Sequence, residues 1–310
     1  LSVPKLSVPK LSVPKLSVPK LSVMAQRKPP TKHGLAVVDK PAGVTSHDVV
    51  GMLRRRFDER QVGHAGTLDP DATGVLLVGV GKATRLLRFL TALGKTYTAD
   101  IVLGTSTSTL DSSGEVTGTF DMSGVTADMA QRVATEHLTG PITQIPPMVS
   151  AVRVDGKRLH ELAREGIEVE RQPRPVTIYS FVVAATDEPS ILRVEVRCSA
   201  GTYIRTLADD LGRMLDGGAH LRDLRRTAVG SFVDSEARPP DECELIAPAD
   251  ALRDYPHVTV DDASAEMVRH GRVLDRFEGD GPWAVVDGQG SLLAVYELFG
   301  AVAKPAVVVA

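Results

Sequence analysis

Residues 63–74 read Gly-His-Ala-Gly-Thr-Leu-Asp-Pro-Asp-Ala-Thr-Gly and place one carboxylate, Asp69, in a segment interrupted by glycines and a proline. Glycine permits positive φ and proline fixes φ, so this composition is typical of a tight loop. The apolar run 75–80 that follows is short and β-branched, which predicts a buried strand rather than a helix. We therefore expect an acidic loop that leads directly into the core.

An aspartate on a glycine-rich turn is more often structural than catalytic, but the wider motif changes this interpretation. Residues 63–85, GHAGTLDPDATGVLLVGVGKATR, resemble the catalytic motif of the TruB family, the tRNA pseudouridine-55 synthases. The resemblance implies that Asp69 is the nucleophile and that His64 supports the flipped-out state of the target base. It extends to residues 104–114, which we expect to form a Ser/Thr-rich loop, and to residues 144–174. Within the loop, Ser108 replaces a common aspartate and Asp111 alone keeps the acid.

A second motif, GTYIR, occupies residues 201–205. Without the resemblance, Arg205 is a surface arginine on the first turn of a helix. The helix dipole makes the N-terminal end less favourable for a cation, so an arginine at this position suggests a carboxylate partner. The resemblance to TruB implies that this partner is Asp69. We expect a bidentate contact that keeps Asp69 ionised and oriented, as a nucleophile requires.

Several further residues are expected at the substrate. Tyr97 is by default a half-buried strand tyrosine; the resemblance implies that it stacks on the target uracil, an interaction worth about 1–3 kcal/mol. Tyr203 belongs to the GTYIR motif, and Lys40 to an Asp-Lys-Pro element that lies near the active site in TruB-like proteins. Arg85, expected on the first turn of a helix, is placed to approach a phosphate, and Leu221 is expected, together with Leu224, to pack near the site.

The pattern of apolar residues predicts both strands and helices. The expected strands are 34–38, 75–80, 95–103, 176–185 and 191–199. Thr45-Ser46 offers an N-cap with Asp48 in the first turn, and the helix expected to follow has Val49, Leu53 and Phe57 on one face. The other expected helices are 83–93, 127–138, 158–165 and 201–215, with a turn at Asp155-Gly156. Residues 217–231 are expected to end the catalytic part with their arginines pointing outward.

These elements predict an α+β fold. The resemblance to TruB implies a pseudouridine synthase catalytic domain over residues 24–249, for which we expect a mixed, mainly antiparallel central sheet. It also implies that the small β-rich part over 250–310 is a PUA-like RNA-binding domain. Residues 1–23 are copies of Leu-Ser-Val-Pro-Lys. Such a repeat forms no core, signal sequence or transmembrane span, so we expect an artefact, with the natural start at Met24.

Composition and charge limit the classes of ligand and partner that we expect for this protein. The formal net charge of −3 argues mildly against a nucleic-acid ligand, yet a basic face on an acidic body suits RNA. Arginines and lysines do cluster, at 54–60, 85–88, 153–158 and 222–226. Cys198 and Cys243 have no metal-ligand spacing and fit a reducing cytosol, and the eight histidines are scattered. We expect a cytoplasmic monomer that binds the T stem-loop of tRNA, with no cofactor, metal or membrane partner.

Two alternatives stay open. A non-catalytic tRNA-binding protein or folding chaperone could use the same arginines and tyrosine, although such a protein gains nothing from a carboxylate that faces phosphates; an enzyme could also help tRNA to fold. A glycosidase-type hydrolase would need two acids about 5–10 Å apart, for which Asp69 and Asp71 are candidates. For the synthase, Asp69 could attack either C1′ of the ribose or C6 of the uracil.

Overall fold

The computed structural model describes residues 29–150, 153–154, 157–158, 167 and 169–309. The expected artefact at 1–23, the start at Met24, the Asp155-Gly156 turn and nearly all of the 158–165 helix lie outside these residues. The two strands that flank the turn, β8 (Arg153–Val154) and β9 (Lys157–Arg158), pair antiparallel.

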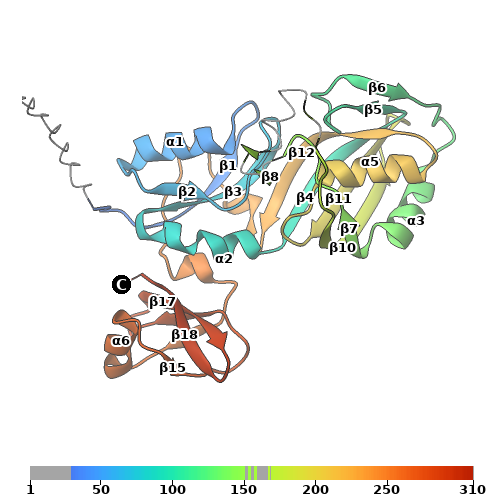
Figure 1. Cartoon of the computed structure of the whole chain (residues 1–310). Coiled ribbons are helices and arrows are strands. Elements are labelled where there is room, and N and C mark those ends of the chain that lie inside the picture. Colours follow the sequence, from blue (N-terminus) through green and yellow to red (C-terminus); the bar gives the residue numbers. More distant parts are fainter. Residues whose placement is uncertain (1–28, 151–152, 155–156, 159–166, 168, 310) are drawn as a thin grey trace, which may run out of the picture.

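A nine-stranded sheet forms the larger part of the molecule, with its main strands in the order β1-β3-β12-β4-β11-β10-β7 (Figure 1). The strand bounds are β1 Gly34–Lys40, β2 Val62–His64, β3 Thr73–Val80, β4 Lys95–Leu103, β7 Gly140–Gln144, β10 Arg174–Ala185, β11 Ile191–Cys198, β12 Ala219–Val229 and β13 Phe232–Val233. The β12–β3 pair is parallel and the other pairs are antiparallel. The prediction of a mixed, mainly antiparallel sheet is confirmed.

Apolar side chains cover β3 on both faces, which explains why its sequence is continuously hydrophobic. Leu76 and Val78 pack with α1 (Ser46–Phe57), whereas Val75 and Leu77 face the opposite cluster, which includes the 3-10 helix η1 (Gly81–Leu86) and α2 (Leu87–Ala92). The predicted helix 83–93 is thus two segments, and it ends with Leu93 extended.

The other half of the sheet buries one face only. Tyr97, Ala99, Ile101 and Leu103 alternate along β4 and pack with α3 (Ala127–His137) and α5 (Ile204–Met214), as their spacing predicted. Residues 104–114, expected as a loop, contain the short strand β5 (Thr105–Thr107), which pairs with β6 (Val116–Thr119).

A separate five-stranded sheet forms the C-terminal module, in the order β14-β16-β17-β18-β15. Its elements are β14 His257–Thr259, α6 Asp262–Arg269, β15 Leu274–Asp275, β16 Trp283–Val286, β17 Leu292–Phe299 and β18 Val302–Val308, and the short helices η2 (Asp234–Glu236) and η3 (Asp250–Leu252) precede it. The module lies against α2, where the Tyr255 hydroxyl donates to the Phe89 carbonyl at 2.8 Å and Arg88 pairs with Glu297 at 2.8 Å (Figure 1). The β-rich character is confirmed, and the boundary at residue 250 stays a prediction.

Candidate active site

The loop that carries Asp69 joins β2 to β3 and is fixed by side chains from the preceding segment. The Lys40 ammonium is buried and donates to the carbonyls of Pro41, Pro70 and Ala72 at 2.7–2.9 Å. Two of these carbonyls, those of Pro70 and Ala72, come directly after Asp69 in the loop, so Lys40 holds the loop by its backbone. Burial lowers the pKa of Lys40 from 10.5 to about 8, although nearby carboxylates oppose this effect.

Asp69 meets Arg205 at the mouth of a cavity. The Arg205 Nε lies 3.0 Å from Asp69 Oδ2; the arginine side chain is only 5% exposed and that of Asp69 is 41% exposed. The Nη1 and Nη2 of Arg205 donate to the carbonyls of Thr109 and Val149 at 3.0 and 2.8 Å. The ion pair therefore uses Nε, and our expectation of a two-point fork between the residues is wrong in that detail.

A second carboxylate, Asp111, lies 3.6 Å from Nη1 of Arg205. Its Oδ1 accepts hydrogen bonds from the Thr109 hydroxyl and from both the backbone and the hydroxyl of Ser113, which orient the group. One buried guanidinium is thus shared between two acids from different loops.

The charge state of Asp69 reflects opposing effects. Burial raises its pKa above the usual aspartate value, Arg205 opposes this rise, and the charge on Asp111 adds to it. We expected Arg205 to dominate. The structure instead gives a carboxylate whose ionised form is disfavoured by burial and partly restored by its ion pair, which suits a reactive nucleophile.

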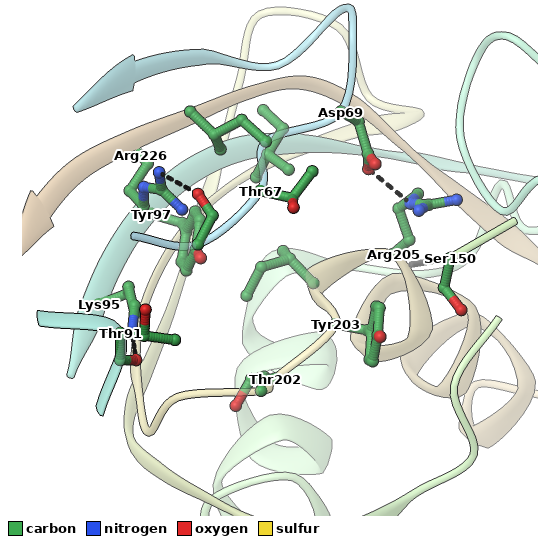
Figure 2. A pocket seen from close by; sticks show the side chains of 15 residues that line it. Thr67, Asp69, Thr91, Lys95, Tyr97, Ser150, Thr202, Tyr203, Arg205 and Arg226 are labelled. Atoms are coloured by element: carbon green, nitrogen blue, oxygen red, sulfur yellow. Dashed lines mark hydrogen bonds and ion pairs between the residues drawn. The ribbon is translucent and has the colours of Figure 1, made fainter. Parts of the chain in front are cut away.

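The cavity has a volume of about 260 Å³ and opens beside Asp69 (Figure 2). Tyr97 and Leu224 line it from the sheet, and Tyr203 and Arg205 line it from the start of α5. The amide of Gln144 fixes this helix start, because it accepts from the Tyr203 backbone N–H at 3.0 Å and donates to the Tyr203 carbonyl at 3.2 Å. Asp69, Tyr97 and the segment 203–205, which are distant in sequence, therefore share one site.

The remaining predicted residues lie elsewhere. His64 is on β2 and half-buried, and burial lowers its pKa. Lys40 lies beneath the loop. Arg85 is at the end of η1, not on a first helical turn, and donates to the Val308 carbonyl of the C-terminal module at 2.9 Å. Leu221 packs in the core next to Ile101 and does not line the cavity, whereas Leu224, also expected near the site, does line it.

The sequence reasoning missed Arg226. We expected the arginines of residues 217–231 to point outward, but Arg226 is 1% exposed and lines the cavity. Its Nε donates to the Val75 carbonyl at 2.7 Å and its Nη2 to that of Gly66 at 3.3 Å. Arg222 and Arg225 are part-exposed, and they pair with Asp100 and Asp39, respectively. The same-strand neighbour Leu224 was the signal that could have indicated an inward-facing Arg226, because alternate residues of a strand share a face.

Lys95 was also missed as a cavity residue. It is 6% exposed, lines the cavity opposite Asp69, and donates to the carbonyls of Thr91 and Leu93 at 2.6 Å each (Figure 2).

Within the described ranges, no group of three His, Cys, Asp or Glu side chains is arranged to hold a metal. No helix in the same ranges is long and apolar enough to span a membrane.

Three family models together match residues 54–242 and 255–310. Residues 54–204 match the N-terminal domain of TruB family pseudouridylate synthase, residues 205–242 match the C-terminal domain of tRNA pseudouridylate synthase B, and residues 255–310 match the C-terminal region of tRNA pseudouridine synthase II. The chain belongs to the TruB family. The family's N-terminal model spans the Asp69 loop and Tyr97.

Individual TruB relatives agree. The chain is 48% identical to tRNA pseudouridine synthase B of Rhodococcus jostii over 89% of this chain and 93% of that protein, and 47% identical to the Corynebacterium aurimucosum protein of the same name over 87% and 93%. Among solved structures it resembles a chain of a Cbf5-Nop10-Gar1 complex, with a TM-score of 0.69, 25% identity and coverage of 89% and 85%. A chain of an H/ACA RNP bound to a substrate RNA containing 2'-deoxyuridine has the same fold, with a TM-score of 0.67, 23% identity and coverage of 89% and 85%.

Proposed function

We propose that this chain forms pseudouridine at position 55 in the T loop of tRNA and that Asp69 is its nucleophile. As a member of the TruB family it is a tRNA pseudouridine synthase, an isomerase that converts uridine to pseudouridine. The observation that supports Asp69 is its position: it is the carboxylate at the cavity mouth, ion-paired to the buried Arg205 at 3.0 Å.

The chemistry needs a covalent partner for the nucleotide and a place for the uracil to turn. The Asp69 carboxylate bonds to the nucleotide, and the N1–C1′ bond breaks with its electron pair left on the uracil. The uracil turns until C5 faces C1′, the C5–C1′ bond forms as Asp69 leaves, and N1 gains a proton while C5 loses one. Atoms and electrons balance without a cofactor.

Tyr97 and Leu224 line the cavity and bind the flipped-out base, Tyr97 by stacking. Tyr203 bounds the opposite side. Extruding a base from a folded loop costs a few kcal/mol. His64, which lies on the strand that precedes the Asp69 loop, supports the vacated position in the RNA. Arg85, at the contact with the C-terminal module, is a candidate for phosphate contact.

The test is tritium release from T-arm RNA labelled at uridine C5. Asp69→Asn removes the nucleophile with little change in shape, so we expect it to abolish release while RNA binding persists. Asp71→Asn is the matched control, because Asp71 is an exposed acid of the same loop that does not line the cavity. We expect the control to keep its activity.

Other results would point to other functions. Binding without release by the unmodified protein would leave a tRNA-binding or chaperone role. Equal loss in both variants would show that the loop matters and would remove the special role of Asp69. Release of free uracil would indicate a hydrolase.

We also propose that the protein acts in the cytoplasm, as a monomer bound to the T stem-loop.

A further inference from the structure

Two buried cations line the cavity on the wall opposite Asp69. Lys95 is 6% exposed and Arg226 is 1% exposed. Within the described part of the chain, neither forms an ion pair with a carboxylate, in contrast to Arg205, which contacts two. Figure 2 shows Asp69 and Arg205 on one side of the cavity and Arg226, Tyr97 and Lys95 on the other.

The hydrogen-bond partners of both cations are neutral: backbone carbonyls for Lys95, and backbone carbonyls and the Tyr97 hydroxyl for Arg226. Lys95 donates to Thr91 and Leu93, and Arg226 donates to Val75 and Gly66. An ammonium has three N–H donors and a guanidinium five, so these bonds leave part of each donor set unused. The positive charges themselves stay unneutralised.

A buried charge without a counter-charge is strongly unfavourable, so its retention needs a reason. Burial lowers the pKa of Lys95 from 10.5 to about 8, and Arg226 adds to this effect. Even so, a group with this pKa is mostly charged at neutral pH. Capping the end of α2 explains the hydrogen bonds of Lys95, but a neutral donor could cap it equally well. The two charges together suggest an anion that occupies the cavity during the reaction.

We propose that Lys95 and Arg226 stabilise the negative charge of the detached uracil. The inference rests on the proposed function. With C1′ held at Asp69, the base extends past Tyr97 toward the opposite wall, where both cations lie. When the N1–C1′ bond breaks, its electron pair stays on the uracil and the charge spreads over N1, O2 and O4. Fixed positive groups beside a developing charge lower the barrier most where water is excluded.

Charge-removing variants test this directly. Lys95→Gln keeps two N–H donors for the carbonyls of Thr91 and Leu93 but removes the charge. Arg226→Gln removes the second charge, and Arg226→Lys is the matched control that retains it. Single-turnover rates of N1–C1′ cleavage, followed as loss of the N-linked target nucleotide, are measured at saturating T-arm RNA that carries either uridine or 5-fluorouridine at that position. Cleavage is the step that both substrates share, because fluorine cannot leave C5 as a proton does. RNA affinity and circular dichroism are measured in parallel.

Fluorine makes the departing uracil a weaker base, so it needs less stabilisation. We expect each Gln variant to lose on the order of 100-fold in rate with uridine and on the order of 10-fold with 5-fluorouridine, at unchanged RNA affinity. Arg226→Lys should lose less than Arg226→Gln. If one Gln variant does not fold, the other carries the comparison.

Equal fold losses on both substrates would mean that the residues only support the structure, and would overturn the inference. Unchanged rates would overturn it as well. Failure of the unmodified protein to convert uridine would instead contradict the proposed function, so the two failures are distinguishable.

Discussion

Replacing Lys40 with methionine tests how the Asp69 loop is held. The side chain of methionine fills similar space but cannot donate. Lys40→Met therefore removes three hydrogen bonds of 2.7–2.9 Å and leaves the carbonyls of Pro41, Pro70 and Ala72 without this donor. Two of the three carbonyls belong to the loop, so stability and nucleophile position should change together.

The expected loss follows from these bonds. A buried carbonyl that loses its partner costs about 1–3 kcal/mol. The substitution also removes a buried ammonium, whose charged form is disfavoured in the fold, and this gain offsets part of the stability lost with the three hydrogen bonds. We expect Lys40→Met to lower the free energy of unfolding by about 2–4 kcal/mol at pH 7. The rate of pseudouridine formation should also fall, on the order of 10- to 100-fold, at temperatures where the variant is folded.

The pH dependence of the free energy of unfolding gives a second test of the role of Lys40. The pKa of Lys40 is about 8 in the fold against 10.5 as the ordinary value. Between these pH values the unfolded chain binds more protons, so the free energy of unfolding rises with pH. For Lys40 this gain is about 2 kcal/mol between pH 7 and pH 10, and the methionine variant lacks it. The difference in stability between the two proteins should therefore grow with pH.

Urea unfolding followed by circular dichroism at pH 7 and pH 10 measures both quantities. Lys304→Met, a change at an exposed lysine of the C-terminal module, is the control and should alter neither. A Lys40 variant as stable as the unmodified protein at pH 7, or a stability difference that does not grow with pH, would refute this account of the loop.

Three other predictions follow from the site and the sheet. Because burial raises the pKa of Asp69, the charged form of this residue destabilises the fold above that pKa. Asp69→Asn should therefore unfold at a higher urea concentration than the unmodified protein at pH 7. This gain in stability should vanish below about pH 4, where Asp69 is protonated in both the folded and the unfolded chain. Asp111→Asn should move the acid limb of the pH–rate profile to lower pH, because the charge of Asp111 raises the pKa of Asp69. It should also reduce the rate about 5- to 10-fold, because Asp111 lies 3.6 Å from the Arg205 guanidinium that pairs with Asp69. An acid limb that does not move would contradict this prediction. Gly74 has φ of +97°, and an added Cβ would lie 2.2 Å from a carbonyl oxygen of β12, so Gly74→Ala should lose more than about 3 kcal/mol of stability in urea unfolding, whereas Gly124→Ala, with open space around it, should be near neutral.

Local signals predicted most of the fold. The N-terminus of α1 was visible in Thr45 followed by Asp48, and the structure has the capping box that this spacing indicates. Strand β4 has the predicted bounds because strict alternation left no other period. Tertiary packing decided what the sequence could not: η1 is a 3-10 segment. Residues three apart share a face in a 3-10 helix, and the apolar pattern of an α-helix contains the same three-residue spacing, so the pattern alone does not separate the two.

The site was predictable where one motif carried the information. Asp69 and Arg205 form the expected ion pair, although they are far apart in sequence. Arg226 was harder to predict, because a basic stretch is typical of an exposed surface and its alternation with Leu224 was the local sign of an inward face. The pairing of β12 with two neighbouring strands shows that Arg226 is buried. The raised pKa of Asp69 depends on burial, which local sequence does not report.

The position of β12 has a consequence for synthesis of the protein. This strand, Ala219–Val229, lies between β3 and β4 and is the link that joins the two halves of the main sheet. A ribosome therefore releases about three quarters of the chain before the sheet can close, and until then the facing edges of β3 and β4 have no partner. Such unpaired edges promote aggregation. Chains that stop before residue 219 should depend on chaperones to stay in solution, and they should lack the wall of the cavity that holds Arg226.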